Sequence, residues 1–376
     1  MSMKASQTVP SPRDQMAAAR RAGKRRPRRR KLRFLRLLMW MICLLLIIGA
    51  LGTGWLFLTP SGNNYRYLAA DTIITTQHRV WAKYLIGQDE LNRRVAEYQK
   101  QFNDMGSEKD THQIASGADD SGGPLVQIEP ISGASYKGYV MTVKDPTKIR
   151  LGVPAVAGKG EKVTSMVRRY GAVAGVNAGG FADPNWKGNG FQPIGVVISQ
   201  GKVYYEDLDK KGETQIVGID KQGKMVAGHY SLKELIAMGV QEGVTFQPRI
   251  IVNGKGLVKN HADGWGIAPR TAMGQRADGA IIFVVIDGRQ PGYSIGADLY
   301  DVQKIMLDHG AVIAANLDGG SSSVLVNEGG IVNKPSSKHG ERYLPTAWLV
   351  FDHPEEAQIP NVWEGLTAKD IDPAKW

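Results

Sequence analysis

The order of apolar and polar positions divides the chain into three parts. Residues Leu37 to Leu58 form an uncharged apolar run of 22 residues, which is long enough to cross a bilayer as a helix. From Asp71 to Phe102, apolar residues recur at helical spacing, and a Gly-, Ser- and Asp-rich stretch follows up to Gly123. Beyond it, short apolar runs of strand length dominate. The pattern predicts a single transmembrane helix over 37–58, a helical stalk with a flexible linker over 59–124, and a globular domain over 125–353 with a tail over 354–376.

The globular domain contains more predicted strands than helices. Its length of about 230 residues suffices for one hydrophobic core. Helical periodicity indicates helices at 162–170, 231–238 and 297–309. Strand-like runs occur at 138–143, 194–199, 202–205, 215–219, 249–252, 281–286, 312–316, 324–327 and 346–351. This composition predicts an α+β domain around a mixed sheet, with residues 181–192 as a loop over any site at the strand ends.

Two passages of the domain share one pattern. In Gly171 to Phe181 and in Gly310 to Ser323, an amphipathic run stops at a glycine, an apolar run follows, and an Asn with paired glycines comes next. A glycine after a helix is typical of a C-cap, and strand carboxyl ends are where open α/β sheets build ligand sites. The pattern predicts site residues at the two strand ends: Asn177, Gly179, Asn316, Asp318, Gly319, Gly320 and Ser321.

A third apolar run ends at Asp287, Gly288 and Arg289. The helix predicted at 297–309 separates this run from the strand that ends near Asp318, and strand, helix and strand in succession predict a parallel β-α-β element. Both carboxylates would then lie at one sheet edge, roughly 5–10 Å apart depending on whether the strands are adjacent or one apart. The two catalytic carboxylates of glycoside hydrolases are separated by distances in this range. Asp-Gly is also an ordinary turn signal, but two such acids beside Asn316 and three serines favour a site.

Four motifs carry a resemblance to a known family. They are Gly-Val-Asn177-Ala-Gly-Gly-Phe, Pro-Arg270-Thr-Ala-Met-Gly, Val-Ile-Asp287-Gly-Arg289 and Asn-Leu-Asp318-Gly-Gly-Ser-Ser. In order and spacing, over roughly residues 125–353, they resemble the phosphodiester glycosidases, whose animal member uncovers mannose 6-phosphate by removing N-acetylglucosamine. The resemblance implies an enzyme that cleaves a sugar from a phosphodiester, with these residues and the Ser321 region as its pocket. The chain is more similar to the bacterial members, many of which are labelled exopolysaccharide biosynthesis proteins.

Charge and hydrogen-bonding capacity suggest a role for each residue. Arg270, and after it Arg289, suits a phosphate because the guanidinium matches two phosphate oxygens. Asp318 is assigned as nucleophile or base and Asp287 as an orienting or metal-binding group, although the reverse assignment stays open.

The remaining polar groups at the strand ends would contact the substrate. The backbone N–H groups of Gly319, Gly320 and Ser321 would form an anion-binding nest, while Asn177 and Asn316 would hold sugar hydroxyls or phosphate. Trp186 and Trp265 either stack on a sugar or anchor their own loops.

The metal requirement stays unknown from the sequence. The spacing of Cys and His residues does not suit zinc, and the paired Asp residues leave calcium or magnesium as options. His261, His309 and His339 are scattered, so a serine-type triad is not predicted.

The basic residues concentrate at the amino-terminal end. Residues 1–36 hold 13 Lys or Arg and one Asp, a charge of +12, so the rest of the chain carries −1 of the total of +11. A polybasic segment before an apolar helix predicts a cytoplasmic tail and an extracellular domain, although a signal peptide is the competing interpretation. The basic run is a topology signal and an anionic-lipid contact, and no nucleic-acid partner is predicted. The single cysteine, Cys43, lies in the apolar run, which suits a bacterial surface domain without disulfides.

These observations predict a hydrolase anchored in the plasma membrane by a single pass. Its substrate would be a glycosyl-1-phosphodiester in a phosphate-containing surface glycan. The alternative is a non-catalytic protein that binds surface glycans or assembles exopolysaccharide. A peptidoglycan amidase or peptidase would need a metal cluster or a triad that the motifs do not supply.

Overall fold

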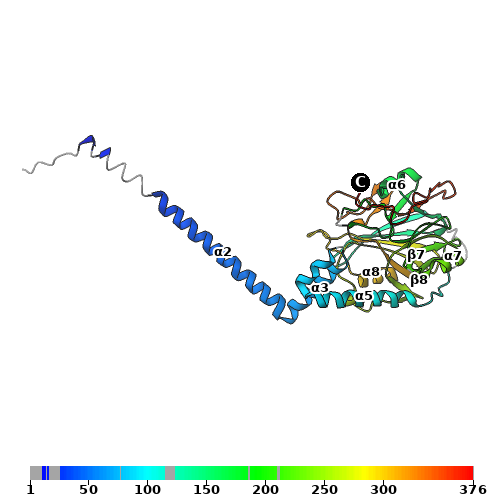
Figure 1. Ribbon diagram of the computed structural model, residues 1–376, viewed down its shortest axis with the longest axis horizontal. Coiled ribbons are helices and arrows are strands. Elements are labelled where there is room, and N and C mark those ends of the chain that lie inside the picture. The colour runs from blue at the N-terminus through cyan, green and yellow to red at the C-terminus, as the bar shows by residue number, and fades with distance from the viewer. Residues whose placement is uncertain are drawn as a thin grey trace, which may run out of the picture. The chain divides into compact units, whose positions relative to one another are not determined.

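The structure is a computed structural model that describes residues 11–13, 15–16, 26–76, 78–114, 123–184, 187–209 and 212–375 (Figure 1). The chain forms two compact units, Met1–Arg66 and Tyr67–Trp376, and each is described by itself. The first unit contains helix α2 (Arg26–Leu58) and the beginning of α3 (Pro60–Ile74). Pro60 occupies the first turn of α3, where its missing N–H costs nothing, and the Thr59 hydroxyl accepts a hydrogen bond from the Gly62 N–H (3.0 Å).

Helix α2 is apolar along most of its length. Residues Leu32–Leu58 have a mean hydropathy of 2.5, and their side chains are not buried within the protein. At 1.5 Å per residue these 27 residues extend for about 40 Å. They contain the predicted span of 37–58. By length and composition this helix can cross a membrane or act as a signal anchor, and it is the single candidate in the described part of the chain.

The second unit contains three sheets. A seven-stranded sheet has the spatial order β1 (Val126–Ser132), β2 (Lys137–Val143), β13 (Ile281–Ile286), β12 (Arg270–Arg276), β14 (Ala311–Leu317), β10 (Arg249–Val252) and β11 (Lys255–Gly256). A five-stranded sheet runs β16 (Gly330–Ile331), β15 (Leu325–Asn327), β4 (Ala174–Asn177), β17 (Ala347–Val350) and β3 (Ile149–Gly152). The other five-stranded sheet runs β6 (Lys202–Asp207), β5 (Gly195–Ser199), β9 (Val240–Thr245), β7 (Glu213–Asp220) and β8 (Met225–Ser231).

Helices of the second unit are short, apart from α5. They are α4 (Lys83–Ile86), α5 (Gln88–Ser107), α6 (Val163–Tyr170), α7 (Leu232–Ala237) and α8 (Leu299–Asp308), with 3₁₀ turns η1 (Arg79–Ala82), η2 (Pro146–Lys148), η4 (His261–Asp263) and η5 (Gly320–Ser322). Gly171 (φ 69°) and Gly310 (φ 82°) follow α6 and α8 in the left-handed conformation. The predicted helix C-caps at these two glycines are confirmed.

The predicted parallel β-α-β element is wrong, because the strand pairs of the described residues are antiparallel. Strand β12 lies between β13 and β14 and pairs antiparallel with each. Since both flanking strands oppose the same strand, they run in one direction, with Ile286 opposite Arg270 and Leu317 opposite Thr271. Asp287 and Asp318 therefore follow two strand ends at one sheet edge, about 10 Å apart at the backbone for two strand spacings.

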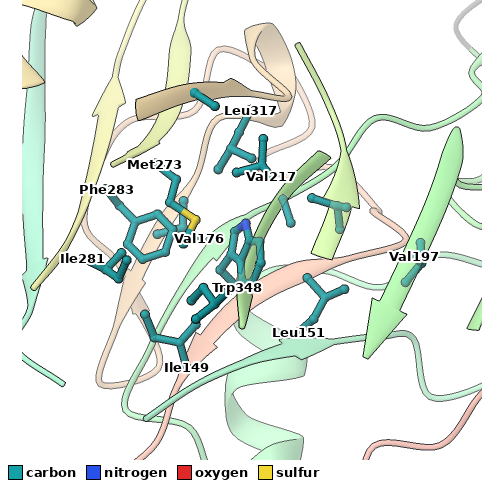
Figure 2. Packing of buried hydrophobic residues seen from close by; sticks show 14 of the residues in the cluster. Ile149, Leu151, Val176, Val197, Val217, Met273, Ile281, Phe283, Leu317 and Trp348 are labelled. Carbon is teal, nitrogen blue, oxygen red and sulfur yellow. The ribbon is translucent and has the colours of Figure 1, made fainter. Parts of the chain in front are cut away.

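The main hydrophobic core lies where the three sheets meet (Figure 2). Figure 2 shows side chains from all three sheets around Trp348 of β17, which is fully buried. Met273 and Phe283 come from the seven-stranded sheet, and Val197 and Val217 come from the sheet that contains β5 and β7. Helix α8 covers the opposite face of the seven-stranded sheet through Leu299, Val302 and Met306, among other residues. This packing fixes the positions of the strand ends that carry the candidate site.

The two segments that flank the predicted domain also pack on it. On the carboxyl side, the Trp363 indole is buried and donates to the Phe191 carbonyl (2.9 Å). On the amino side, the rings of Tyr98 and Phe102 in α5 contact Trp265 edge-on, with centroids 6.1 and 4.9 Å away. Helix α5 is therefore part of the second unit, whereas a spacer was expected. Residues 115–122 of the expected flexible linker lie outside the described residues.

Candidate active site

The candidate site is built around the turn that follows β14. The Asp318 N–H donates to the Ala178 carbonyl (3.1 Å), and the Gly320 N–H donates to the Pro269 carbonyl (2.8 Å). Gly320 has φ 62°, a conformation that glycine adopts at little cost. The turn is thereby fixed to the residues after β4 and to the residue before β12. The two repeated Asn-and-glycine motifs therefore meet at this turn.

Asn177 lies behind this turn and is fully buried. Its amide nitrogen donates to the main-chain oxygen of Asp318. Its amide oxygen accepts from the Thr271 hydroxyl and the Val324 N–H, both at 3.0 Å. These bonds join β4, β12 and the two segments that follow β14, so Asn177 holds the turn in place from the interior.

The Asp318 carboxyl combines burial with an unused oxygen. Its Oδ2 atom is buried and has no hydrogen-bond partner. Burial raises the pKa of Asp318 from 3.8 to about 6, although hydrogen bonding from Ser322 and the charge of Arg342 act in the opposite direction. A carboxylate with a raised pKa and a vacant acceptor oxygen is suited to nucleophilic or general-base chemistry.

Two arginines flank Asp318. The guanidinium nitrogens of Arg289 lie 3.2 and 3.3 Å from the point where a Cβ on Gly320 would stand. Arg289 has φ 58°, a left-handed conformation that costs a non-glycine residue about 1 kcal/mol. No described residue forms an ion pair with it, although Asp318 attracts its charge. Arg342 donates to the Ser321 hydroxyl (3.1 Å) and to the Asp183 carboxylate (2.8 Å).

Arg342 and Asp183 also lie at the candidate site, and the sequence motifs did not indicate them. Asp183 is almost fully buried and forms an ion pair with Arg342. The pair joins the 181–192 loop to the segment before β17, and Arg342 also stacks over the Phe181 ring at 5.2 Å. The one available signal was the position of Asp183 in the loop expected over the site.

Arg270 begins β12 and is buried behind Arg289. Its guanidinium donates to the carbonyls of Ala297 (3.2 Å), Trp265 (3.0 Å) and Gly266 (2.7 Å). Within the described residues, no carboxylate comes within ion-pair distance of it. Burial lowers the pKa of Arg270 to about 10, and repulsion by the Arg289 charge adds to this shift. Two neighbouring cations without a paired carboxylate favour the binding of an anion.

Asp287 is placed differently from Asp318, although both follow strand ends. Its carboxylate accepts from the Asn333 amide and the Lys334 N–H, both at 2.9 Å, and from the Tyr293 hydroxyl at 3.0 Å. Burial raises its pKa, while these three bonds lower it. Both Asp287 oxygens are occupied, so this carboxylate anchors the 333–334 segment. Of the two acids, only Asp318 has a buried oxygen without a partner.

Residues 170–351 match the family model described as phosphodiester glycosidase. The match to a phosphodiester glycosidase domain thus covers just under half of the chain. The matched range contains Asn177, Arg270, Asp287, Arg289 and Asp318. It also contains Asp183 and Arg342.

A protein relative and a solved structure extend the comparison. The chain is 32% identical over 214 residues to the SPbeta prophage-derived uncharacterized protein YomE of Bacillus subtilis strain 168, covering 54% of this chain and 32% of that protein. It thus spans about a third of that relative. The catalytic domain of zebrafish N-acetylglucosamine-1-phosphodiester alpha-N-acetylglucosaminidase, auto-inhibited by its pro-peptide, matches with a TM-score of 0.51 at 22% identity, covering 65% of this chain and 87% of that one. At this identity the likeness shows a shared fold.

Several glycines of the phosphodiester glycosidase motifs serve close packing. A Cβ on Gly179 would lie 2.8 Å from the Val244 side chain, and one on Gly319 would lie 3.0 Å from the Pro269 oxygen. The Gly320 N–H donates to the Pro269 carbonyl (2.8 Å), and the Gly319 N–H lowers the pKa of the neighbouring Asp318 carboxyl. The Gly320 donor of the expected anion-binding nest is therefore occupied within the protein.

The remaining candidates divide between the pocket and the scaffold. Asn316 donates to the Gln247 carbonyl (3.1 Å), and its buried amide oxygen has no partner. Ser321 accepts from Arg342, as described above. Trp265 is buried under α5 and anchors its loop, which leaves it unable to stack on a sugar. Trp186 lies outside the described residues.

The described residues contain one group of three potential metal ligands. His261, Asp298 and Asp301 bring ligand atoms within 4.8 Å of one another. Asp298 already bonds to His261 (2.8 Å) and caps α8 through the Asp301 N–H (2.9 Å). Asp287 and Asp318 are not part of this group. Asp287 and Asp318, which the sequence suggested as ligands for calcium or magnesium, follow strands on either side of β12.

Proposed function

We propose that this protein is a membrane-anchored glycosidase that removes a sugar from a glycosyl-1-phosphodiester of a cell-surface polysaccharide. The observation that carries the proposal is the buried, unpartnered oxygen of Asp318 beside two arginines. The family match supports a hydrolase of phosphodiester glycosides. The apolar helix at 32–58 supports anchoring, and the basic tail supports a cytoplasmic amino terminus.

In this mechanism the substrate phosphate binds between Arg289 and Arg342, whose guanidinium groups match its oxygens. Asp318, ionised above about pH 6, attacks the anomeric carbon directly or removes a proton from an attacking water. The bond between the anomeric carbon and the phosphate oxygen breaks, and the sugar gains its hydroxyl from water. The departing phosphate monoester keeps the bonding electrons, and the arginines stabilise its added charge.

The hydrogen bonds of Arg270 lead us to propose a different role for this residue. Arg270 was the first choice for the phosphate, but its guanidinium holds the 265–266 and 297 carbonyls. Arg270 would instead contribute its positive charge from behind Arg289 and so strengthen the attraction of the site for phosphate. Asp287 keeps its orienting role, because its carboxylate holds the 333–334 segment beside the pocket.

The test compares two aspartates that both follow strands of one sheet. The full chain in detergent is incubated with a panel of sugar-1-phosphodiesters, including an α-linked N-acetylglucosamine, and the released sugar is measured. We expect Asp318→Asn to lower kcat at least 10³-fold, whereas Asp287→Asn, whose amide still bonds to its neighbours, retains more than a tenth of the activity. Parallel reactions with EDTA, calcium or magnesium test the need for a divalent cation.

Two results would contradict the proposal. If both variants remained folded and lost kcat equally, Asp318 would have no special role in the reaction. Binding of surface glycan without release of sugar from any substrate would instead support a non-catalytic glycan-binding or assembly protein.

A further inference from the structure

Two lysines outside the pocket share one aromatic ring. The ammonium nitrogens of Lys137 and Lys334 lie 5.1 and 4.8 Å from the centroid of the Tyr293 ring, within the range of cation–π attraction. We call Lys137 and Lys334 the lysine pair. Both residues are exposed, and neither forms an ion pair with a described acid. Their distances from a common ring place the two charges no more than about 10 Å apart.

The position of the lysine pair is fixed by buried groups. Tyr293 donates its hydroxyl proton to Asp287, and the same carboxylate accepts the Lys334 N–H. Because the Asp287 oxygens are used in this way, they hold the ring and the Lys334 backbone without pairing with an ammonium group. Burial and the bond to Asp287 raise the pKa of Tyr293 to about 12, so the ring stays neutral beneath the two cations.

The lysine pair is close to the reaction pocket. Arg289 and Tyr293 belong to one short hairpin, closed by the Gln290–Ser294 bridge. Two residues after Lys334, the Ser336 hydroxyl donates to the Gly320 carbonyl (3.5 Å) in the turn after Asp318. Two residues span at most about 7 Å of chain. The pair therefore flanks the pocket on the side that Asp287 supports.

Two like charges held this close repel each other, and water screens them only partly over about one Debye length of 10 Å. A bound anion would remove this repulsion and would find both ammonium groups already oriented. We propose that the lysine pair binds a second phosphate group of the substrate, next to the phosphate held by Arg289 and Arg342. This inference rests on the proposed function and narrows its substrate to a polymer with repeated sugar-phosphate units.

The experiment separates this second site from the reaction itself. The full chain in detergent is assayed at low ionic strength with a substrate that has one phosphodiester and with its dimer, which has two. The Lys137→Gln/Lys334→Gln variant is compared with the Lys233→Gln/Lys255→Gln variant, which removes the same charge from exposed positions elsewhere. For the parent and for the control variant, we expect kcat/KM to be at least tenfold higher with the dimer than with the single phosphodiester. The difference should come from a lower KM for the dimer. The lysine-pair variant should lose this preference and keep its rate with the single phosphodiester within twofold.

A binding measurement keeps the inference testable if no sugar is released. Calorimetry with inorganic tripolyphosphate and with monophosphate should show tighter binding of tripolyphosphate that depends on the lysine pair, and this result would support the second site while the hydrolase proposal failed. Sugar release without a preference for the dimer, or a preference kept by the lysine-pair variant, would overturn the second site alone. If the lysine pair increased the affinity for phosphatidylglycerol vesicles but not for tripolyphosphate, the pair would bind a membrane surface. This result would overturn the proposal that it binds a second phosphate of a polymeric substrate.

Discussion

The side-chain amide of Asn177 donates to the main-chain oxygen of Asp318 and so joins β4 to the turn after β14. The two residues are 141 positions apart and belong to the two repeated motifs. The relationship gives a role to the Asn of the first motif: Asn177 supports the turn from inside the protein, and the turn presents the acid.

Replacing Asn177 should therefore destabilise the fold. Asn177→Ala removes three hydrogen bonds and leaves buried groups on Asp318, Thr271 and Val324 unpaired, so we expect a loss of about 2–4 kcal/mol of unfolding free energy. Thr271→Val removes one of the same bonds and should cost about 1 kcal/mol. Urea unfolding of the detergent-solubilised chain measures both. Similar losses in the two variants would show that the amide is not the central connection.

The raised pKa of Asp318 predicts a dependence of activity on pH. As nucleophile or base, Asp318 must be ionised, so kcat/KM should rise with pH through about 6 and then level off. A rate that falls over the same range would indicate that the protonated carboxyl is the active form, and Asp318 would then act as a general acid.

The same carboxyl predicts a dependence of stability on pH. Between 3.8 and about 6 the folded state binds more protons at Asp318 than the unfolded state does, so stability present below pH 4 is lost as pH rises through 6. Asp318→Asn should therefore be more stable than the parent at pH 8, by about 1–2 kcal/mol once partial exposure is considered, and nearly equal below pH 4. Thermal unfolding at both pH values measures the difference. If the stability difference between the variant and the parent were the same at both pH values, the cause would be packing and not the ionisation of Asp318.

Arg289 and Arg342 should differ in their effects on stability but agree in their effects on activity. Each change to Gln should lower kcat/KM by about 10- to 10³-fold, because a phosphate contact is lost. Arg289→Gln should leave stability almost unchanged. Arg342→Gln leaves Asp183 buried without its cation and should cost about 1–3 kcal/mol. Adding Asp183→Asn should recover stability but not activity, and recovery of both would contradict the phosphate role of Arg342.

Removing the amino-terminal helices should weaken the second unit. A chain that begins at Gly123 lacks Tyr98 and Phe102, which cover Trp265, and lacks the Met105 carbonyl that accepts from Arg249 (3.0 Å). We expect it to unfold at lower urea concentration than a chain that begins at Tyr67, and to expose Trp265 to fluorescence quenchers. Equal urea midpoints for the two chains would show that the packing of α5 does not stabilise the second unit.

The sequence located the strand ends but did not show how the strands pair. The glycines after the helices and the apolar runs before Asp287 and Asp318 gave local signals that the structure confirms. Strand β12 was missed because its Arg ends and central Gly274 break the apolar pattern, and its insertion between β13 and β14 depends on pairing with distant residues. Arg342 and Asp183 lie in loops without periodicity, so only the fold reveals that they meet. Helix α5 was expected to be part of a stalk, because helical periodicity alone does not show which surface an apolar face packs against.

The contact between α3 and the Trp265 loop has a mechanical consequence. The chain from the apolar helix α2 enters the second unit through α3, where the Thr72 hydroxyl accepts the Ile267 N–H (3.1 Å). The carbonyls of the two residues before Ile267 hold the Arg270 guanidinium. If α2 is fixed in a bilayer while the substrate belongs to a stiff surface polymer, tension along the chain is transmitted to the loop that positions a cation behind the pocket.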